Sequence, residues 1–237
     1  LYIMKNLYFL IFALSFFICS SLFSQSLKVA SADELIEFSK MFSQPNESFG
    51  FSSDTDLPSD FSLVYWAPPV VDQQGSSCVG HAISTSLSIT HNMLNDITEF
   101  GRCFLHRFDP YYVYSGLKQE NNIECSIGCE CGAYIWEGLE LVINYGIKKQ
   151  VINPGLKCRD VLTNKMLLNL TNKTSQYMID DYYAMITYDD NGQKNIWDLE
   201  DIKEAIYYGH APIVGIQVGE DFDDVTAKYQ LPKKIHY

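Results

Sequence analysis

A cysteine at the point where a loop passes into a helix is the feature that most restricts this sequence. Residues 72–82 read Asp-Gln-Gln-Gly-Ser-Ser-Cys-Val-Gly-His-Ala, so Cys78 directly follows a Gly/Ser-rich loop. Apolar residues then recur at helical spacing, which predicts a helix over 78–95 with one buried face. Peptide N–H groups at a helix N-terminus favour a thiolate over a thiol. The pattern therefore predicts a nucleophilic cysteine whose backbone is anchored by the core.

Polar side chains occupy the other side of this predicted helix. Ser84, Ser88, His91 and Asn92 fall mostly opposite its apolar positions. We expect His91, and also His81, to be a surface residue or a hydrogen-bonded residue of the helix.

The later part of the chain predicts two more helices and then a strand. One helix covers 132–145, with Gly146 as its C-cap. The other begins with Asp198 as N-cap and ends at Gly209. The apolar run 212–218 predicts a buried strand.

The beginning of the chain has the pattern of an export signal. Lys5 precedes an apolar stretch over 7–22, and small residues follow it, so residues 1–26 are expected to be a signal peptide. A retained membrane span is the alternative, but no stop-transfer pattern follows. The mature protein is thus expected to be secreted or periplasmic, with no membrane span.

A polar, Ser-rich extension is expected over 27–56, with a short amphipathic helix over 33–41. At about 30 residues it is short for an inhibitory propeptide. The globular domain is expected over 57–237.

Composition limits the class of partner. A chain of 237 residues that is 47% apolar can bury one substantial core, divided at most into two lobes. Its net charge is −12, and its 17 Lys and Arg residues form no basic stripe. These properties argue against nucleic acid and anionic membrane surfaces as partners, and favour peptides or small molecules.

The cysteines other than Cys78 and Cys19 are odd in number. They are Cys103, Cys125, Cys129, Cys131 and Cys158. An oxidising compartment favours disulfides among them, with one thiol left over or bonded elsewhere. The cluster at 125–131 has no histidine at the spacing of a zinc finger, so no metal is expected.

Three segments resemble papain-like cysteine peptidases, in the version found among secreted bacterial proteins. They occur in the family's order and together span Leu57 to about Phe222. The first contains Leu57-Pro58, Trp66, Pro69-Val70, Asp72-Gln73 and Ser77-Cys78. The second contains Gly132-Ala133-Tyr134 and Asn144-Tyr145-Gly146-Ile147. The third contains residues 201–206, Gly209 and Pro212-Ile213-Val214-Gly215-Ile216.

This resemblance implies an α+β, two-lobed fold with a helical first lobe and a β-rich second lobe that is incomplete in these residues. It implies a hydrolase in which the Cys78 thiolate attacks a peptide carbonyl and forms an acyl-enzyme. Gln73 or Gln74 would supply the side-chain amide of the oxyanion hole. Substrates would be peptides or proteins, and no cofactor is expected.

The chain departs from the family's pattern at several positions. The family's glutamine lies six residues before the cysteine, whereas Gln73 lies five before it, so the loop is one residue short. Gly75 stands where the family has a cysteine. A catalytically impaired domain that binds peptides or a protein partner is therefore the alternative. In a third reading, a disulfide-stapled structural domain, Cys78 itself would be oxidised.

The predicted site also needs a histidine, and two candidates, His210 and His236, lie late in the sequence. His210 lies within the interval of about 130 to 150 residues after Cys78 that is typical of the family. It precedes the run that comes before the catalytic histidine in relatives, however, which favours a loop histidine. His236 has no strand around it, and no asparagine follows His210. The catalytic histidine and asparagine are therefore expected beyond Tyr237.

Overall fold

The computed structural model describes residues 57–98, 105–120, 132–150, 177–184 and 199–215. It also describes the shorter pieces 31, 33–34, 37, 129, 156–157, 160, 186–188 and 194–196. The expected signal peptide, most of the extension, and His236 lie outside the described residues. Within the extension, Asp33, Glu34 and Glu37 are helical, in agreement with the short helix expected over 33–41.

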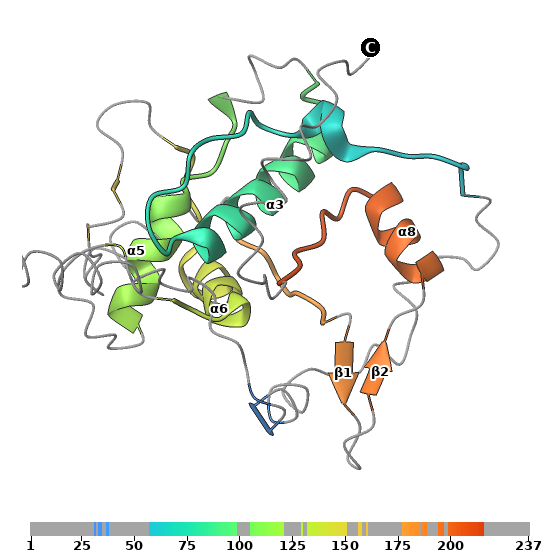
Figure 1. The fold of residues 1–237 in the computed structure, drawn as a ribbon. Helices are drawn as coiled ribbons and strands as arrows, with labels where there is room; N and C mark the ends of the chain where they lie inside the picture. The colour runs from blue at the N-terminus through green and yellow to red at the C-terminus, as the bar shows by residue number, and fades with distance from the viewer. Residues whose placement is uncertain are drawn as a thin grey trace, which may run out of the picture.

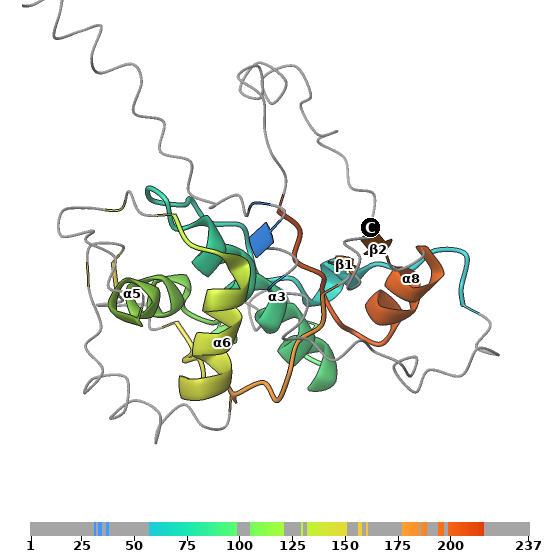
Figure 2. The same ribbon diagram turned by 90° about the horizontal axis from the view of Figure 1, so that it is seen from below.

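Three helices pack together and form the centre of the molecule. They are α3 (Cys78–Leu94), α5 (Pro110–Glu120) and α6 (Ile135–Tyr145), and each contacts the other two (Figure 1). A 3-10 helix, η2 (Leu63–Trp66), lies against α3. The view from below shows α8 (Leu199–Tyr207) on the other side of the molecule from α5 and α6 (Figure 2).

The described strands form one antiparallel hairpin. It joins β1 (Ile186–Tyr188) to β2 (Lys194–Ile196), with Ile186 opposite Ile196 and Tyr188 opposite Lys194. Figure 1 shows this hairpin near α8.

The core lies where the three central helices meet. Each helix contributes buried apolar side chains, and the segments next to α5 and α6 add the rest. The cluster is formed by Val79, Ile83, Phe108, Tyr112, Val113, Leu117, Ala133, Leu141, Val142 and Ile147. Glycine at position 80 permits the close approach of α3 and α5, because a Cβ there would lie 2.4 Å from the Pro110 carbonyl oxygen.

The predicted helix at Cys78 is confirmed, but its polar residues were placed on the wrong side. Ser84, Ser88 and Asn92 are fully buried rather than turned away from the core. Several of their polar atoms have partners: Ser88 Oγ accepts a hydrogen bond from the Phe108 N–H (2.9 Å), and Asn92 Nδ2 donates to the Trp66 carbonyl (2.9 Å), whereas the buried Asn92 Oδ1 has no hydrogen-bond partner. Hydrogen bonding thus offsets part of the cost of burying them.

The other two predicted helices are also present. α6 starts at Ile135, three residues later than expected, and ends at Gly146 with a φ of 73°. The end of α8 is followed by Gly209, with a φ of 90°. Asp198, its expected N-cap, lies outside the described residues.

The buried strand expected over 212–218 is wrong in its described part. Residues 212–215 form no regular secondary structure, and Val214 is 71% exposed. A strand is stabilised by a neighbouring strand, and none of the described residues pairs with this run.

Within the part of the chain that the structure describes, no helix has both the length and the apolar character needed to cross a membrane.

Candidate functional site

A pocket of about 450 Å³ runs along one side of α3. Its walls come from the extended stretch before α3, from α3 itself and from the stretch after α8. Its lining residues are Pro68, Pro69, Val70, Val71, Gln73, Cys78, His81, Ala82, Thr85, Ser86, Ile89, Arg107, Ala211, Pro212, Ile213 and Val214. Two residues expected from the sequence, Gln73 and Cys78, therefore line one pocket. Gln74 and His210 are not among its lining residues.

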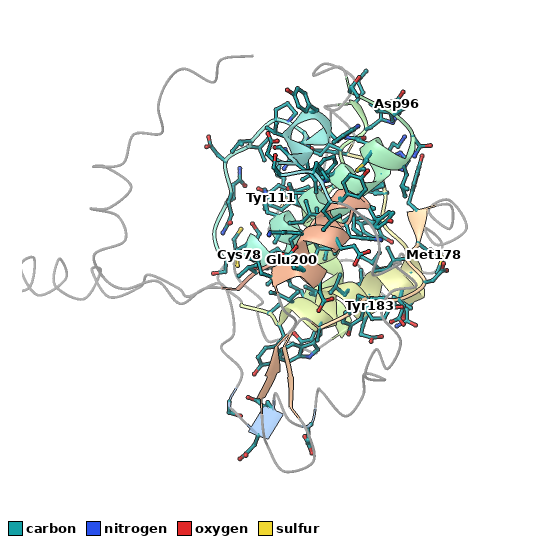
Figure 3. The ribbon with its side chains drawn as sticks, turned by 90° about the vertical axis from the view of Figure 1, so that its right-hand side faces the viewer. Cys78, Asp96, Tyr111, Met178, Tyr183 and Glu200 are labelled. Carbon is teal, nitrogen blue, oxygen red and sulfur yellow. The ribbon has the colours of Figure 1, made fainter. Side chains whose placement is uncertain are left out.

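Cys78 is the first residue of α3 and is half-buried (Figure 3). Its side chain packs against the core cluster and takes part in no disulfide. The preceding Ser77 makes no side-chain cap, and the first turn of α3 contains no acidic residue. The positive end of the helix dipole therefore meets no carboxylate from that turn.

The 73–77 loop holds itself in place through its own polar groups. Gln73 Nε2 donates to the Gly75 carbonyl (2.8 Å), and Ser77 Oγ donates to the Gln74 carbonyl (2.8 Å). Ser76 and Ser77 are buried. The Gln73 amide has a second N–H hydrogen, and the residue also lines the pocket. Between the two expected glutamines, the geometry thus favours Gln73 for a role in the pocket.

Tyr111, at the start of α5, supports the same loop from one side. Its hydroxyl has hydrogen-bond contacts with the Gln74 backbone and the Ser77 side chain. Burial raises the pKa of Tyr111, and the contact with Gln74 partly offsets that effect. In Figure 3, Tyr111 and Cys78 lie on the same side of the molecule.

His81 is the histidine that lines the pocket together with Cys78. The expectation of a surface or hydrogen-bonded residue is wrong for it, since its Nε2 atom is buried and has no hydrogen-bond partner. Burial, and secondly the charge of Arg107, lower its pKa to about 4. The ring meets Tyr111 edge-on, with centroids 5.3 Å apart. A neutral imidazole of this kind is poorly suited to hold a proton as the partner of a thiolate.

A group of buried charges lies next to the pocket. Arg107 is 2% exposed, and its Nη1 donates to the Pro69 carbonyl (3.3 Å). Asp109 is 1% exposed and faces Lys148, with 3.9 Å between Oδ2 and Nζ. Burial raises the pKa of Asp109, and Lys148 partly opposes the shift. Arg107 therefore fastens the segment before α5 to the pocket wall at Pro69.

His210 lies just after α8 and is exposed. Its N–H donates to the Ala205 carbonyl (2.9 Å), which ends the helix, and burial of part of the ring lowers its pKa. The next residues, Ala211 and Pro212, do line the pocket. The structure thus brings the neighbours of His210 to Cys78, but not His210 itself.

Among the expected disulfide cysteines, the structure describes Cys129, and this residue is disulfide-bonded. Its partner lies outside the described residues, as do the other four cysteines of that group. A bonded Cys129 argues against the metal site weighed for the cluster at 125–131. Among the described residues there is also no group of three or more metal-binding side chains.

Sequence reasoning missed Arg107, Tyr111 and the environment of His81. Arg107 and Tyr111 belong to the segment Arg107-Phe108-Asp109-Pro110-Tyr111 at the start of a helix that was not predicted. An aspartate followed by proline is a helix-start signal, and it could have located α5. Nothing in the sequence indicates that α5 packs against the 73–77 loop.

No family model matches this chain, and no curated protein matches it either.

Proposed function

We propose that this chain is a secreted cysteine peptidase of the papain-like type, with Cys78 as its nucleophile. The observation that carries the proposal is the position of Cys78, at the first residue of a core-anchored helix and on the wall of a pocket. That position combines N–H groups that favour a thiolate with room for a substrate. The resemblance in three ordered segments supports the same reading.

In the proposed reaction the Cys78 thiolate attacks the carbonyl carbon of a peptide bond. The electron pair of the C=O bond moves to oxygen, and the second N–H of the Gln73 amide stabilises the resulting oxyanion. The intermediate collapses to a thioester and releases the amine, which takes up a proton. Water then hydrolyses the thioester and regenerates the thiol. The proton has to be held by a histidine other than His81, and the resemblance assigns that role to the second lobe.

Peptide hydrolysis tests this proposal. The full-length protein, with the second-lobe histidine that the resemblance assigns, is incubated with a mixed peptide library alongside its Cys78→Ser and Cys78→Ala variants, and products are identified by mass. We expect cleavage by the full-length wild type and at least a thousandfold loss in both variants, because the nucleophile is removed. Equal cleavage by wild type and variants would assign the activity to a contaminant or to another site.

The second candidate is a papain-like domain that binds peptides without cleaving them. Two observations favour it: the Gln73 amide is already bonded to Gly75, and His210 is absent from the pocket lining. This reading predicts that wild type and Cys78→Ala bind the same peptides with equal affinity and that neither forms products. Isothermal titration alongside the cleavage assay separates the two candidates.

A further inference from the structure

The wall of the pocket beside α3 carries a positive charge and no carboxylate. Among the described residues that line it, Arg107 is the only Lys, Arg, Asp or Glu, and burial keeps the imidazole of His81 neutral. The chain as a whole has a net charge of −12. A cation that stands on a pocket wall without a carboxylate beside it favours an anionic ligand.

The guanidinium of Arg107 is buried, yet its hydrogen-bonding capacity is not used up. The residue is 2% exposed, and its Nη1 donates to the Pro69 carbonyl over 3.3 Å. Its Nε is buried and has no hydrogen-bond partner among the described groups. A buried cation with an unpaired N–H costs free energy in the empty pocket. A ligand with acceptor oxygens would recover that cost.

His81 brings a second unpaired nitrogen to the same wall. Its Nε2 is buried without a hydrogen-bond partner, and the Arg107 charge contributes to its low pKa, so the two side chains are neighbours. Tyr111 adjoins both of them, since it meets the His81 ring edge-on and interacts electrostatically with Arg107. A carboxylate offers two acceptor oxygens. One such group could accept from Arg107 and from the Nε2–H tautomer of His81.

Asp109 does not cancel the charge at this wall. It attracts Arg107, but it is 1% exposed and is not among the residues that line the pocket. Its Oδ2 also faces Lys148 Nζ at 3.9 Å. Two cations therefore share one buried carboxylate, and positive charge remains for a ligand.

The position of His81 sets the distance between such a ligand and the sulfur of Cys78. His81 follows Cys78 by three residues on α3, so both side chains project from one face of the helix, about one turn apart. One turn rises about 5.4 Å, and an extended peptide advances about 3.3 to 3.6 Å per residue. A carboxylate held at His81 would thus belong to a residue within one or two positions of the bond at Cys78.

We propose that Arg107 and His81 form a carboxylate-binding subsite in the pocket, which selects peptides that carry a carboxylate within one or two residues of the bond that Cys78 attacks. The carboxylate is either the C-terminus of the peptide or the side chain of an aspartate or glutamate. The selection of a cleaved bond rests on the proposed function, whereas the binding of the carboxylate does not.

Isothermal titration with the full-length Cys78→Ala protein tests the subsite without requiring cleavage. The probes are acetyl-tetraalanine amide, acetyl-tetraalanine with a free C-terminal carboxylate, and amides with one glutamate or one glutamine at each position in turn. We expect one carboxylate peptide to bind about ten- to a hundredfold more tightly than its uncharged match.

The two sources of the carboxylate give different results in this titration. Preference for the free C-terminus would assign the subsite to the end of a peptide chain. Preference for a glutamate peptide over its glutamine match would assign it to an acidic side chain. Equal affinity for the charged and uncharged members of every pair would overturn the proposal.

Variants of Arg107 locate the preference in the pocket. Arg107→Met should abolish it while the uncharged peptides keep their affinity, and Arg107→Lys should retain part of it, because a positive charge remains. Lys203→Met is the control: Lys203 is exposed on α8 and does not line the pocket, so the preference should be unchanged. A preference that survives in Arg107→Met would overturn the assignment.

His81→Phe keeps the test decisive if Arg107→Met does not fold. This variant removes the second donor and should reduce the preference about two- to tenfold. An unchanged preference in His81→Phe would exclude His81 from the subsite and contradict the proposal.

Cleavage of the same peptides by the full-length wild type separates this inference from the proposed function. The kcat/KM values should follow the order of the affinities. Binding preference without any cleavage would uphold the subsite and refute the proposed peptidase. Cleavage at equal rates for charged and uncharged peptides would refute the subsite and leave the peptidase standing.

Discussion

His81 has the most unusual surroundings of any described side chain in the pocket. Burial and the nearby Arg107 charge keep its imidazole neutral, and its Nε2 atom has no hydrogen-bond partner. A buried nitrogen of this kind costs stability, and the protein retains it next to Cys78. Because His81 belongs to α3, this residue links the pocket to the stability of the fold in acid.

Replacement of His81 by phenylalanine should make the protein less sensitive to acid. The folded pKa of about 4 lies below the ordinary value of 6.5, so between these pH values the unfolded chain binds a proton that the folded chain does not. Wild-type stability therefore falls as the pH drops from 6.5 to 4. Because the ring is half-buried and partly screened, the effect is about 1–2 kcal/mol at pH 4.5.

Urea unfolding at pH 7 and pH 4.5 measures this difference. His81→Phe should lose less stability than wild type between the two values. It should retain some dependence, because burial and the neighbouring charges of Lys149 and His106 also lower the pKa of His91. Identical pH dependence in both proteins would show that His81 is protonated normally in the fold.

Gln73 and Gln74 should differ sharply in their effect on catalysis. Gln73→Glu keeps the shape of the side chain but removes its N–H donors, and we expect kcat to fall on the order of 100 to 1,000-fold. Gln74→Glu should change kcat little, because Gln74 does not line the pocket. Steady-state kinetics on one peptide substrate compares them. Equal losses of kcat in the two variants would contradict the proposed role of Gln73 in stabilising the oxyanion.

At the scale of elements, the close packing of α3 on α5 positions both the nucleophile and Tyr111. The two helices meet where Gly80 faces the Pro110 carbonyl, and α5 begins there with Asp109 as its cap. Asp109 Oδ1 accepts a hydrogen bond from the Tyr111 N–H (3.0 Å). The start of α5 is thereby fixed relative to the start of α3.

Gly80→Ala should destabilise the fold by about 1–3 kcal/mol, because the new Cβ meets a backbone oxygen that cannot move alone. Gly138→Ala is the matched control on α6. Its Cβ would lie 2.4 Å from Cδ1 of Ile83, the far end of a flexible side chain, so a smaller loss is expected. Thermal unfolding compares the two variants, and an equal or larger loss in Gly138→Ala would contradict the packing argument.

The sequence predicts an element well where its pattern is strong and local. The start of α3 at Cys78 and the glycine that ends α6 follow from periodicity and capping signals. The hairpin β1–β2 was missed although the Asn191-Gly192 pair between its strands is a turn signal. The strand at 212–218 was expected from composition alone, and composition does not supply a neighbouring strand.

In the candidate site, too, residues with a local sequence signal were predicted and residues placed by tertiary packing were not. Cys78 and Gln73 were identified because a loop-to-helix junction is visible in the sequence. Arg107 and Tyr111 were missed because their contacts, with the Pro69 carbonyl and with the 73–77 loop respectively, depend on tertiary packing. The burial of Ser84 and Ser88 also depends on partners that are distant in the chain, such as the Phe108 N–H.

At the scale of the whole molecule, the pocket joins segments that are far apart in the sequence. Thr90 Oγ1 donates to the Gly209 carbonyl (2.9 Å), and Ser86 Oγ donates to the Ala211 carbonyl. These bonds hold the stretch after α8 against α3, where Pro212 and Val214 complete the pocket wall.

Removing both hydroxyls should loosen that wall. In the double variant Ser86→Ala/Thr90→Val we expect faster hydrogen exchange over 209–215 and a higher KM for peptides, since each bond contributes about 1 kcal/mol. The exposed Ser59 provides the control Ser59→Ala, which should leave both quantities unchanged. Unchanged exchange over 209–215 in the double variant would show that other contacts hold the wall.

The most direct test of the central claim, that Cys78 is an activated nucleophile, is its alkylation by a peptidyl epoxide at pH 5.5. Adducts are located by mass spectrometry, and the rate is compared with that of glutathione under the same conditions. We expect an adduct at Cys78 that forms at least about a hundredfold faster than the glutathione adduct, because thiolate is the reactive form. Alkylation no faster than that of glutathione would contradict it.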